Sequence, residues 1–260
     1  MSNKLKTVKN TPSRQKYVHL YEEITTLWLE GKTRKYICDK YGFSTSLTHN
    51  ILKRCNLKNP LPKSVDLDYY EKSVLIGTIM GDTHILKGSN KTSSINFAHY
   101  NKHKEYFDFK VNILKKLGKG FNKEYSKIDK RTGNTYISNT YTSLSFLELK
   151  TLRFIFYPNG KKILPIEYLK NNFNEISLAY LYMDDGSSYK YNTIISLQCY
   201  EREELLEFID LLKTKFDLDF TLQSNKTLRI KQKDVSKFKE LIKSEVEKIK
   251  CMEYKILCPH

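Results

Sequence analysis

Two segments of the chain are almost wholly apolar, and each leads into an acidic residue. Residues 75–83 read LIGTIMGDT and residues 178–186 read LAYLYMDDG. A helix that is apolar on every side lies in the interior of a soluble protein, and small residues such as Gly77 allow a second backbone to approach closely. The pattern predicts two buried helices that pack side by side and bring Asp82 and Asp185 together at one end.

The segments that follow these two helices are patterned alike. Each copy continues with strand-like alternation, an amphipathic helix, further alternation and a last helix. The first copy has strands near 83–86, 94–100 and within 121–144, and helices over 104–118 and 145–157; the second has strands near 193–200 and 220–230, and helices over 201–216 and 235–249. The sequence therefore predicts an α+β fold of two αββαββα repeats related by a pseudo-two-fold axis, over residues 66–170 and 171–260.

The N-terminal part predicts a separate all-α domain over residues 1–60. Residues 17–29 have apolar side chains at helical spacing, a second helix follows, and Gly42 turns the chain into a third helix over 44–55. This order is typical of a helix-turn-helix, whose second helix enters the major groove of DNA. A structural helical cap is the alternative interpretation. The candidate DNA contacts on the third helix are Thr45, Thr48 and Asn50. Residues 56–62, with two prolines, read as a linker.

The charge balance indicates an anionic partner. The 260 residues contain 45 Lys+Arg against 29 Asp+Glu, which gives a net charge of +16, and 40% hydrophobic residues are enough for a sizeable core. A surplus of this size favours a phosphate-rich partner, because each neutralised phosphate releases condensed counterions. A merely soluble basic protein is the alternative.

Signals of membrane insertion or secretion are not found in the sequence. No stretch approaches the roughly 18 apolar residues of a membrane span, and the opening MSNKLKTVKNTPSRQK has no hydrophobic core. The five cysteines form no CxxC pair, which argues against a zinc knuckle or a redox site. We expect a soluble, intracellular monomer without a membrane partner, in the cytoplasm or nucleoid of a bacterium or phage-infected cell, or in an organelle.

The paired carboxylates indicate metal chemistry on a phosphodiester. Asp82 and Asp185 at neighbouring helix ends would repel each other, and the negative helix C-terminus disfavours each of them further. A shared cation resolves this repulsion, and carboxylate oxygens suit Mg²⁺, with Mn²⁺ as a substitute. Such a metal polarises a phosphate and lowers the pKa of an attacking water. Lys162 and Lys255 recur in similar KILP and KILCP contexts and are expected either to stabilise the charge of the transition state or to help activate water.

These residues resemble the LAGLIDADG homing endonucleases of the single-chain, two-motif type, and the match covers about residues 66–260. The resemblance implies saddle-shaped antiparallel sheets in the major groove, motif helices at the interface between the repeats, and metal-dependent cleavage of both strands of double-stranded DNA. By motif position, Asp82 and Asp185 are the metal-binding catalytic carboxylates, and the backbone carbonyls of Gly81 and Asp184 lie nearby. The resemblance also gives Lys162 and Lys255 as lysines of the catalytic pocket.

The motifs depart from the family pattern at a few positions. Thr83 replaces the last glycine of the first motif, and Met80 and Met183 occupy the sixth place of the two motifs. Tyr180 replaces the third-place glycine of the second motif, so we expect the two helices to pack less closely than in an ideal pair.

Three functions remain after the sequence alone. The first is a site-specific DNA endonuclease, the second a DNA-binding regulator on the same scaffold, and the third an RNA maturase that binds its host intron RNA. Base contacts are expected from polar and basic side chains of the strands. The candidates are Asn96, His99, Gln198, Gln223, Lys226 and Arg229.

Overall fold

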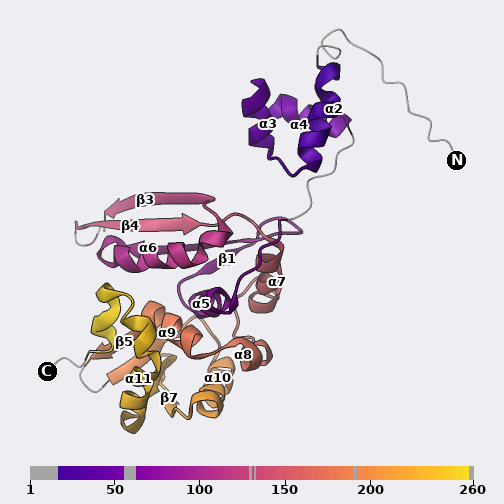
Figure 1. Ribbon diagram of the computed structural model, residues 1–260. Coiled ribbons are helices and arrows are strands. Elements are labelled where there is room, and N and C mark those ends of the chain that lie inside the picture. The colour runs from indigo at the N-terminus through magenta and orange to yellow at the C-terminus, as the bar shows by residue number, and fades with distance from the viewer. Residues whose placement is uncertain (1–16, 56–62, 129–130, 132, 190–191, 258–260) are drawn as a thin grey trace. The chain divides into compact units, whose positions relative to one another are not determined.

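The chain divides into two compact units, Met1–Pro62 and Lys63–His260, and each is described by itself. The computed structural model describes residues 17–55, 63–128, 131, 133–189 and 192–257 (Figure 1). The expected linker over 56–62 and Cys258 lie outside the described residues.

Within its described residues, 17–55, the N-terminal unit contains three short α-helices around a small core. They are α2 (Tyr21–Leu29), α3 (Arg34–Tyr41) and α4 (Thr45–Arg54), preceded by the 3₁₀ turn η1 (Val18–Leu20). The side chains of Thr33 and Ser44 cap α3 and α4 by accepting backbone N–H groups. Gly42 ends α3 with a φ of 66°, a left-handed conformation that glycine adopts at little cost. The helices therefore lie where the sequence pattern predicts them.

The larger unit contains two copies of one topology, as predicted. The first copy comprises α5 (Tyr69–Met80), β1 (His84–Leu86), β2 (Ser94–Tyr100), η2 (Asn101–His103), α6 (Lys104–Ile113), η3 (Leu114–Leu117), β3 (Phe121–Ile128), β4 (Thr135–Thr142) and α7 (Leu147–Phe156). The second comprises α9 (Glu175–Asp185), β5 (Gly186–Tyr189), β6 (Asn192–Ser196), α10 (Arg202–Phe216), β7 (Phe220–Leu222), β8 (Thr227–Ile230), η4 (Gln232–Asp234), α11 (Val235–Val246) and η5 (Lys250–Lys255). A connecting helix that the sequence pattern did not predict, α8 (Ile166–Asn172), lies between them.

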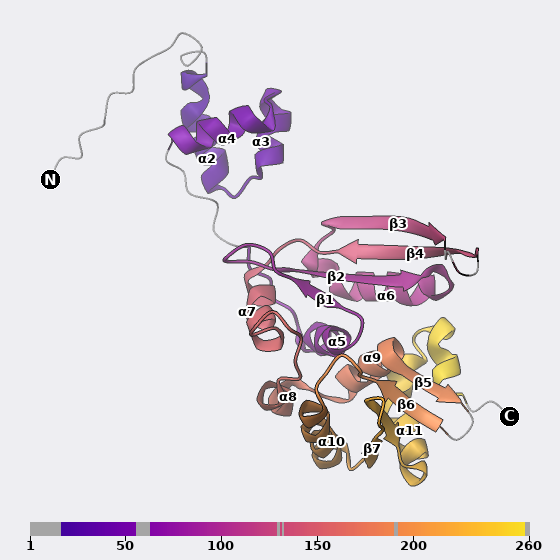
Figure 2. The same cartoon turned by 180° about the vertical axis from the view of Figure 1, so that it is seen from behind.

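Each copy forms a four-stranded antiparallel sheet with the same strand order. The orders are β1-β2-β4-β3 and β5-β6-β8-β7, and Figure 2 shows one sheet in each half, with α5 and α9 between them. In the first sheet, β3 and β4 continue beyond the end of β2. They pair as far as Ile128 with Thr135, whereas β2 stops at Tyr100 opposite Ser138. The predicted α+β fold class is confirmed.

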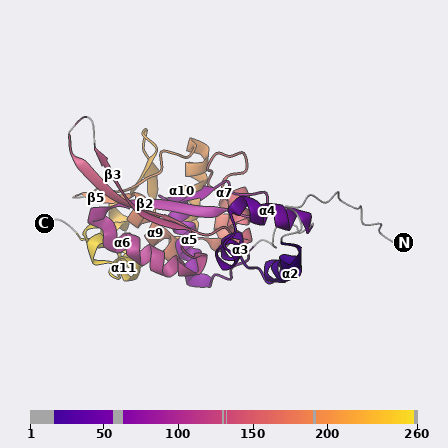
Figure 3. The same ribbon diagram turned by 90° about the horizontal axis from the view of Figure 1, so that it is seen from above.

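Helices α5 and α9 pack together at the centre of the larger unit (Figure 3). A Cβ atom placed on Gly77 would lie 2.3 Å from the carbonyl oxygen of Ser177, so the two backbones are in direct contact. The hydroxyl of Ser177 also donates a 2.9 Å hydrogen bond across the interface to the carbonyl of Ser73. The interface therefore brings the C-terminal ends of both helices to one place.

The prediction that Tyr180 loosens this interface is wrong. Its ring stacks with the ring of Tyr106 at 6.4 Å between centroids, and its hydroxyl lies 3.1 Å from that of Tyr70. Both stacked rings are fully buried. The bulk of Tyr180 is thus accommodated against other side chains, and the close approach at Gly77 is preserved.

None of the helices in the described part of the chain is long and apolar enough to cross a membrane.

Candidate active site

Asp82 and Asp185 lie at the same end of the α5–α9 pair. Asp185 is the last residue of α9, and Asp82 follows Gly81, the residue that ends α5. Burial and then the charge of Asp184 raise the pKa of Asp82 to about 6. Burial and then the charges of Asp82 and Asp184 raise the pKa of Asp185 to about 7. The structure therefore gathers partly desolvated carboxylates that repel one another, and a cation would relieve this repulsion.

The two sequence-predicted lysines each reach the carbonyl end of one motif helix. The Nζ of Lys162 donates to the carbonyl of Gly81 at 2.7 Å and to that of Met80 at 3.2 Å. The Nζ of Lys255 donates to the carbonyls of Tyr182 and Met183. An ammonium group at a helix C-terminus offsets the negative end of the helix dipole. The carbonyl of Gly81, a predicted metal ligand, is therefore already an acceptor for Lys162.

Burial lowers the pKa of both lysines. Lys255 is only 5% exposed, and burial is the largest cause of its lowered pKa, against the raising effect of nearby Asp184. Burial is likewise the largest cause for Lys162. The structure therefore holds two desolvated ammonium groups beside the carboxylate pair.

The side chain of Asp184 has a role that the sequence did not indicate. Its Oδ1 and Oδ2 accept from the Nζ of Lys110 at 3.0 and 3.2 Å, and Oδ1 also accepts from the hydroxyl of Tyr106 at 2.7 Å. Oδ2 accepts from the backbone N–H of Asp82 at 3.3 Å. Only the backbone carbonyl of Asp184 was a predicted ligand, whereas its carboxylate links the two repeats.

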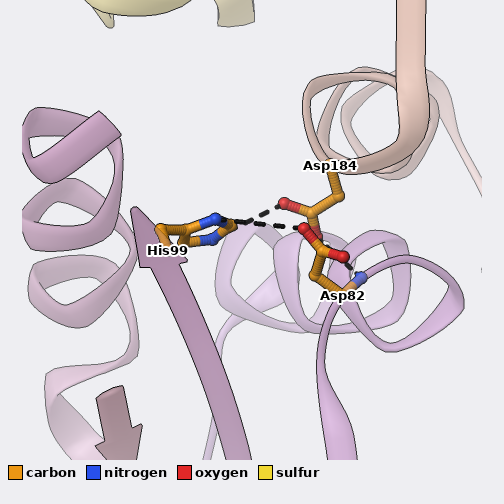
Figure 4. Close-up of side chains that lie close together, drawn as sticks. All are labelled: Asp82, His99 and Asp184. Carbon is orange, nitrogen blue, oxygen red and sulfur yellow. Dashed lines mark hydrogen bonds and ion pairs between the residues drawn. The ribbon is translucent and has the colours of Figure 1, made fainter. Parts of the chain in front are cut away.

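The prediction that His99 contacts DNA bases is wrong. His99 lies on the buried face of β2, only 7% exposed, and its Nε2 is 3.0 Å from the Nζ of Lys110. Burial, followed by the charge of Lys110, lowers its pKa to about 3. Figure 4 shows its ring pointing toward Asp82 and Asp184. His99 therefore belongs to the interior of the site.

Asp82, His99 and Asp184 each offer one possible ligand atom, and these three atoms lie within 4.8 Å of one another, close enough to hold a metal ion. Lys110 already provides a positive charge there, because its ammonium group is bonded to both Asp184 and His99. A metal ion bound to these three residues would be repelled by the ammonium group of Lys110.

The outer face of the first sheet carries polar and aromatic side chains. Asn96 faces this side, half-buried, and its amide donates to the carbonyl of Tyr141 and the hydroxyl of Thr142 at about 3 Å. Tyr100 on β2 and Tyr125 on β3 are each 55% exposed. Strand alternation places both tyrosines on the outward face, although neither was among the predicted DNA contacts.

The four other residues that were predicted to contact DNA from the strands differ in solvent exposure. Arg229 on β8 and Gln198 after β6 are exposed. The half-buried amide of Gln223 donates to the hydroxyl of Thr221 at 3.1 Å. The Nζ of Lys226 is bonded to the carbonyl of Tyr200 and the carboxylate of Glu201. Arg229 and Gln198 are thus the more accessible of the four.

In the N-terminal unit, Thr45 and Asn50 are exposed on α4, but Thr48 is not accessible to DNA. Thr48 is fully buried, its hydroxyl donates to the carbonyl of Ser44 at 3.2 Å, and it lies 3.2 Å from the Sγ of Cys38. The prediction that Thr48 contacts DNA is therefore corrected, because this side chain packs α3 against α4.

Comparison with known proteins adds an independent finding. The model of the LAGLIDADG DNA endonuclease family matches residues 72–238. A probable intron-encoded endonuclease 1 of Wickerhamomyces canadensis is 29% identical over 202 residues, which cover 74% of this chain and 85% of that protein. Intron-encoded endonuclease ai4 of Dictyostelium discoideum is 34% identical over 84 residues, covering 32% of this chain and 51% of that one. The solved structure of the homing endonuclease I-WcaI bound to its DNA recognition sequence has a TM-score of 0.67 at 27% identity, covering 75% of this chain and 88% of that chain.

Proposed function

Because this chain belongs to the LAGLIDADG DNA endonuclease family, we propose that it cuts both strands of duplex DNA at a specific site with a divalent metal. The family predicted from the two motifs is thereby confirmed. The observation that carries the proposal is the pair Asp82 and Asp185, two carboxylates with raised pKa values at adjoining helix ends. Each helix end is also contacted by a lysine, the half-buried Lys162 and the buried Lys255.

The residues present fit Mg²⁺, with Mn²⁺ as a substitute. Asp82 and Asp185 offer hard oxygen ligands. Burial and the charge of Asp184 raise the pKa of Asp82, and burial and the charges of Asp82 and Asp184 raise that of Asp185, so a cation held by both would recover that cost. When bound, the metal would polarise the scissile phosphate and lower the pKa of the attacking water.

Besides the metal, the ammonium groups of Lys162 and Lys255 supply positive charge to the site. A lysine ammonium has three N–H donors, and Lys162 and Lys255 each use two of them on helix carbonyls. One donor of each is left for a phosphate oxygen. We assign them the role of stabilising the extra negative charge that develops during hydrolysis.

The DNA is proposed to lie along the outer faces of the two sheets. Tyr100 and Tyr125 give the first sheet an exposed aromatic surface, and Arg229 gives the second an exposed guanidinium. The net charge of +16 favours the phosphate backbone without regard to sequence. Because one chain contains both half-sites, a monomer is sufficient for cutting both strands.

The N-terminal unit is proposed as a second DNA-reading module. The face of α4 turned away from its core carries Thr45, His49, Asn50 and Lys53, all exposed and polar. Such a face suits the major groove, which presents hydrogen-bond donors and acceptors on every base pair.

The proposal is tested with a library of duplexes incubated with the protein and Mg²⁺, followed by sequencing of the cut ends. Once a target is known, Asp82→Asn and Asp185→Asn are each expected to abolish double-strand cleavage while DNA binding in Ca²⁺ changes little. Asp108→Asn, at an exposed carboxylate on α6, is the matched control. Full cutting by the double Asn variant would refute the proposal.

Binding without any cutting would favour the DNA-binding regulator. Binding of the host intron RNA that is unaffected by both Asn substitutions would favour the maturase, because that role does not need the carboxylates.

A further inference from the structure

The two halves of the site differ at the residue that precedes each catalytic aspartate. This residue is Gly81 in the first motif and Asp184 in the second. A Cβ atom on Gly81 would lie 2.7 Å from the Cβ of Asp184 and 3.0 Å from its Oδ2. The interface therefore has room for one side chain, and Asp184 fills it by projecting from the second repeat into the first.

A buried lysine of the first repeat neutralises Asp184. Lys110 lies on α6, and the side chains of Lys110 and Asp184 are both 0% exposed. The ammonium group also lies 4.6 Å from the centroid of the Phe97 ring. Removing one member of such a pair leaves an uncompensated charge in the interior, which is strongly unfavourable. Each member therefore holds the other in a defined position.

Two contacts lead from this pair to Asp82. In the first, Oδ2 of Asp184 accepts the backbone N–H of Asp82 at 3.3 Å. In the second, the ring of His99 has its Nε2 3.0 Å from the Nζ of Lys110 and its other nitrogen on the side of Asp82, toward which the ring points in Figure 4. An ammonium group can only donate, so Nε2 of His99 is the acceptor and Nδ1 carries the proton. That Nδ1 faces Oδ2 of Asp82 at 3.9 Å.

Asp185 has no comparable support. Within the described residues, no hydrogen bond or ion pair reaches its carboxylate. The second repeat also contacts the first motif helix through Tyr200, whose hydroxyl donates to the carbonyl of Met80 at 2.7 Å. This contact is neutral and involves only the helix backbone. The Lys110–Asp184 ion pair therefore has contacts to Asp82 that Asp185 lacks.

We propose that Lys110 and Asp184 are positioning residues for Asp82 alone, so that the two DNA strands are cut by half-sites with different structural requirements. The cleavage part of this inference rests on the proposed endonuclease function.

The first experiment measures the cutting of each strand separately. A target duplex carries a different fluorophore on each strand and is cut under single-turnover conditions in Mg²⁺, and Asp82→Asn identifies the strand that depends on Asp82. We expect Lys110→Met to slow that strand roughly 10- to 100-fold, the usual cost of losing an outer partner of a metal ligand, and the other strand less than about twofold.

A double variant separates positioning from folding. Lys110→Met with Asp184→Asn leaves no buried charge unpaired, so we expect a melting temperature near that of the wild type and the same strand-selective loss. Lys104→Met, at an exposed lysine on the same helix, should leave both rates unchanged. Equal slowing of both strands, or wild-type rates in the double variant, would overturn the inference.

The second experiment needs neither metal nor DNA. Amide hydrogen exchange at Asp82 in the metal-free protein is expected to be about tenfold faster in the double variant, because a charge-assisted acceptor is lost. Unchanged exchange at this amide would also overturn the inference. If the wild type cuts no duplex, the proposed function fails, and this second measurement still decides whether Lys110 and Asp184 position Asp82.

Discussion

Asp185→Asn should make the metal-free protein more stable at neutral and alkaline pH. The pKa of Asp185 rises from an ordinary 3.8 to about 7 in the folded protein. The folded state therefore binds more protons than the unfolded state between these two values, so stability falls as the pH rises through this window. A difference of roughly 3 pKa units corresponds to about 4 kcal/mol at 1.36 kcal/mol per unit. Because water reaches this half-buried carboxylate, we reduce the expected gain to about 2 kcal/mol at pH 8.

The assay is urea denaturation in EDTA at a series of pH values between 4 and 8. The stability difference between Asp185→Asn and the wild type is expected to be small near pH 4 and to reach its full size above pH 7. Adding Mg²⁺ should stabilise the wild type and have less effect on the variant, because a ligand that binds only the folded state raises the free energy of unfolding. A difference that does not change with pH, or a destabilised variant at pH 8, would refute the reasoning.

A control with the opposite sign is provided by Asp219. Hydrogen bonds from Lys233 and Lys213 lower its pKa from 3.8 to about 2. Asp219→Asn should therefore destabilise the protein at neutral pH, and that loss should disappear as the pH falls from about 4 through 2, so for this variant the pH series is extended down to 2. Opposite pH trends in the two variants would show that the local charge environment, and not the amide itself, causes each effect.

Three further outcomes are expected. Gly77→Ala places a Cβ 2.3 Å from the carbonyl oxygen of Ser177, so thermal or urea denaturation should show a loss of about 1–3 kcal/mol or more. Lys162→Met and Lys255→Met should each reduce the rate of cutting roughly 10²-fold in a single-turnover assay, with DNA affinity nearly unchanged. Deleting residues 1–60 should weaken DNA binding without abolishing cutting, and should make the salt dependence of binding less steep because phosphate contacts are lost; a truncated protein that is folded but inactive would contradict this.

Two of the corrected predictions could have been avoided with the sequence alone. Asn96 and His99 are three residues apart on one strand, an odd number, so they face opposite sides of the sheet. On α4, Thr48 precedes the apolar Ile51 by three residues and therefore shares its buried face. In both cases the residue type suggested a DNA contact, whereas the periodicity already placed the side chain inside.

The position of Tyr180 required the tertiary structure. Replacing a motif glycine with tyrosine suggested a wider interface, since nothing in the sequence shows where the ring goes. The ring packs beside Tyr106, which lies on α6 of the other repeat. Which neighbouring element has space for a large side chain depends on how the two repeats are assembled.

By itself, the sequence determined the repeated αββαββα order and the two apolar motif helices, and it predicted Asp82, Asp185, Lys162 and Lys255 as candidate catalytic residues. These features follow from local periodicity and from duplication, and both can be recognised in a single sequence. Only the tertiary structure decided that Asp184 pairs with Lys110, because the two residues are 74 positions apart and lie in different repeats. An ion pair of this kind depends on the distance between atoms after folding, and for that reason the asymmetry of the two half-sites could not be predicted from the motifs.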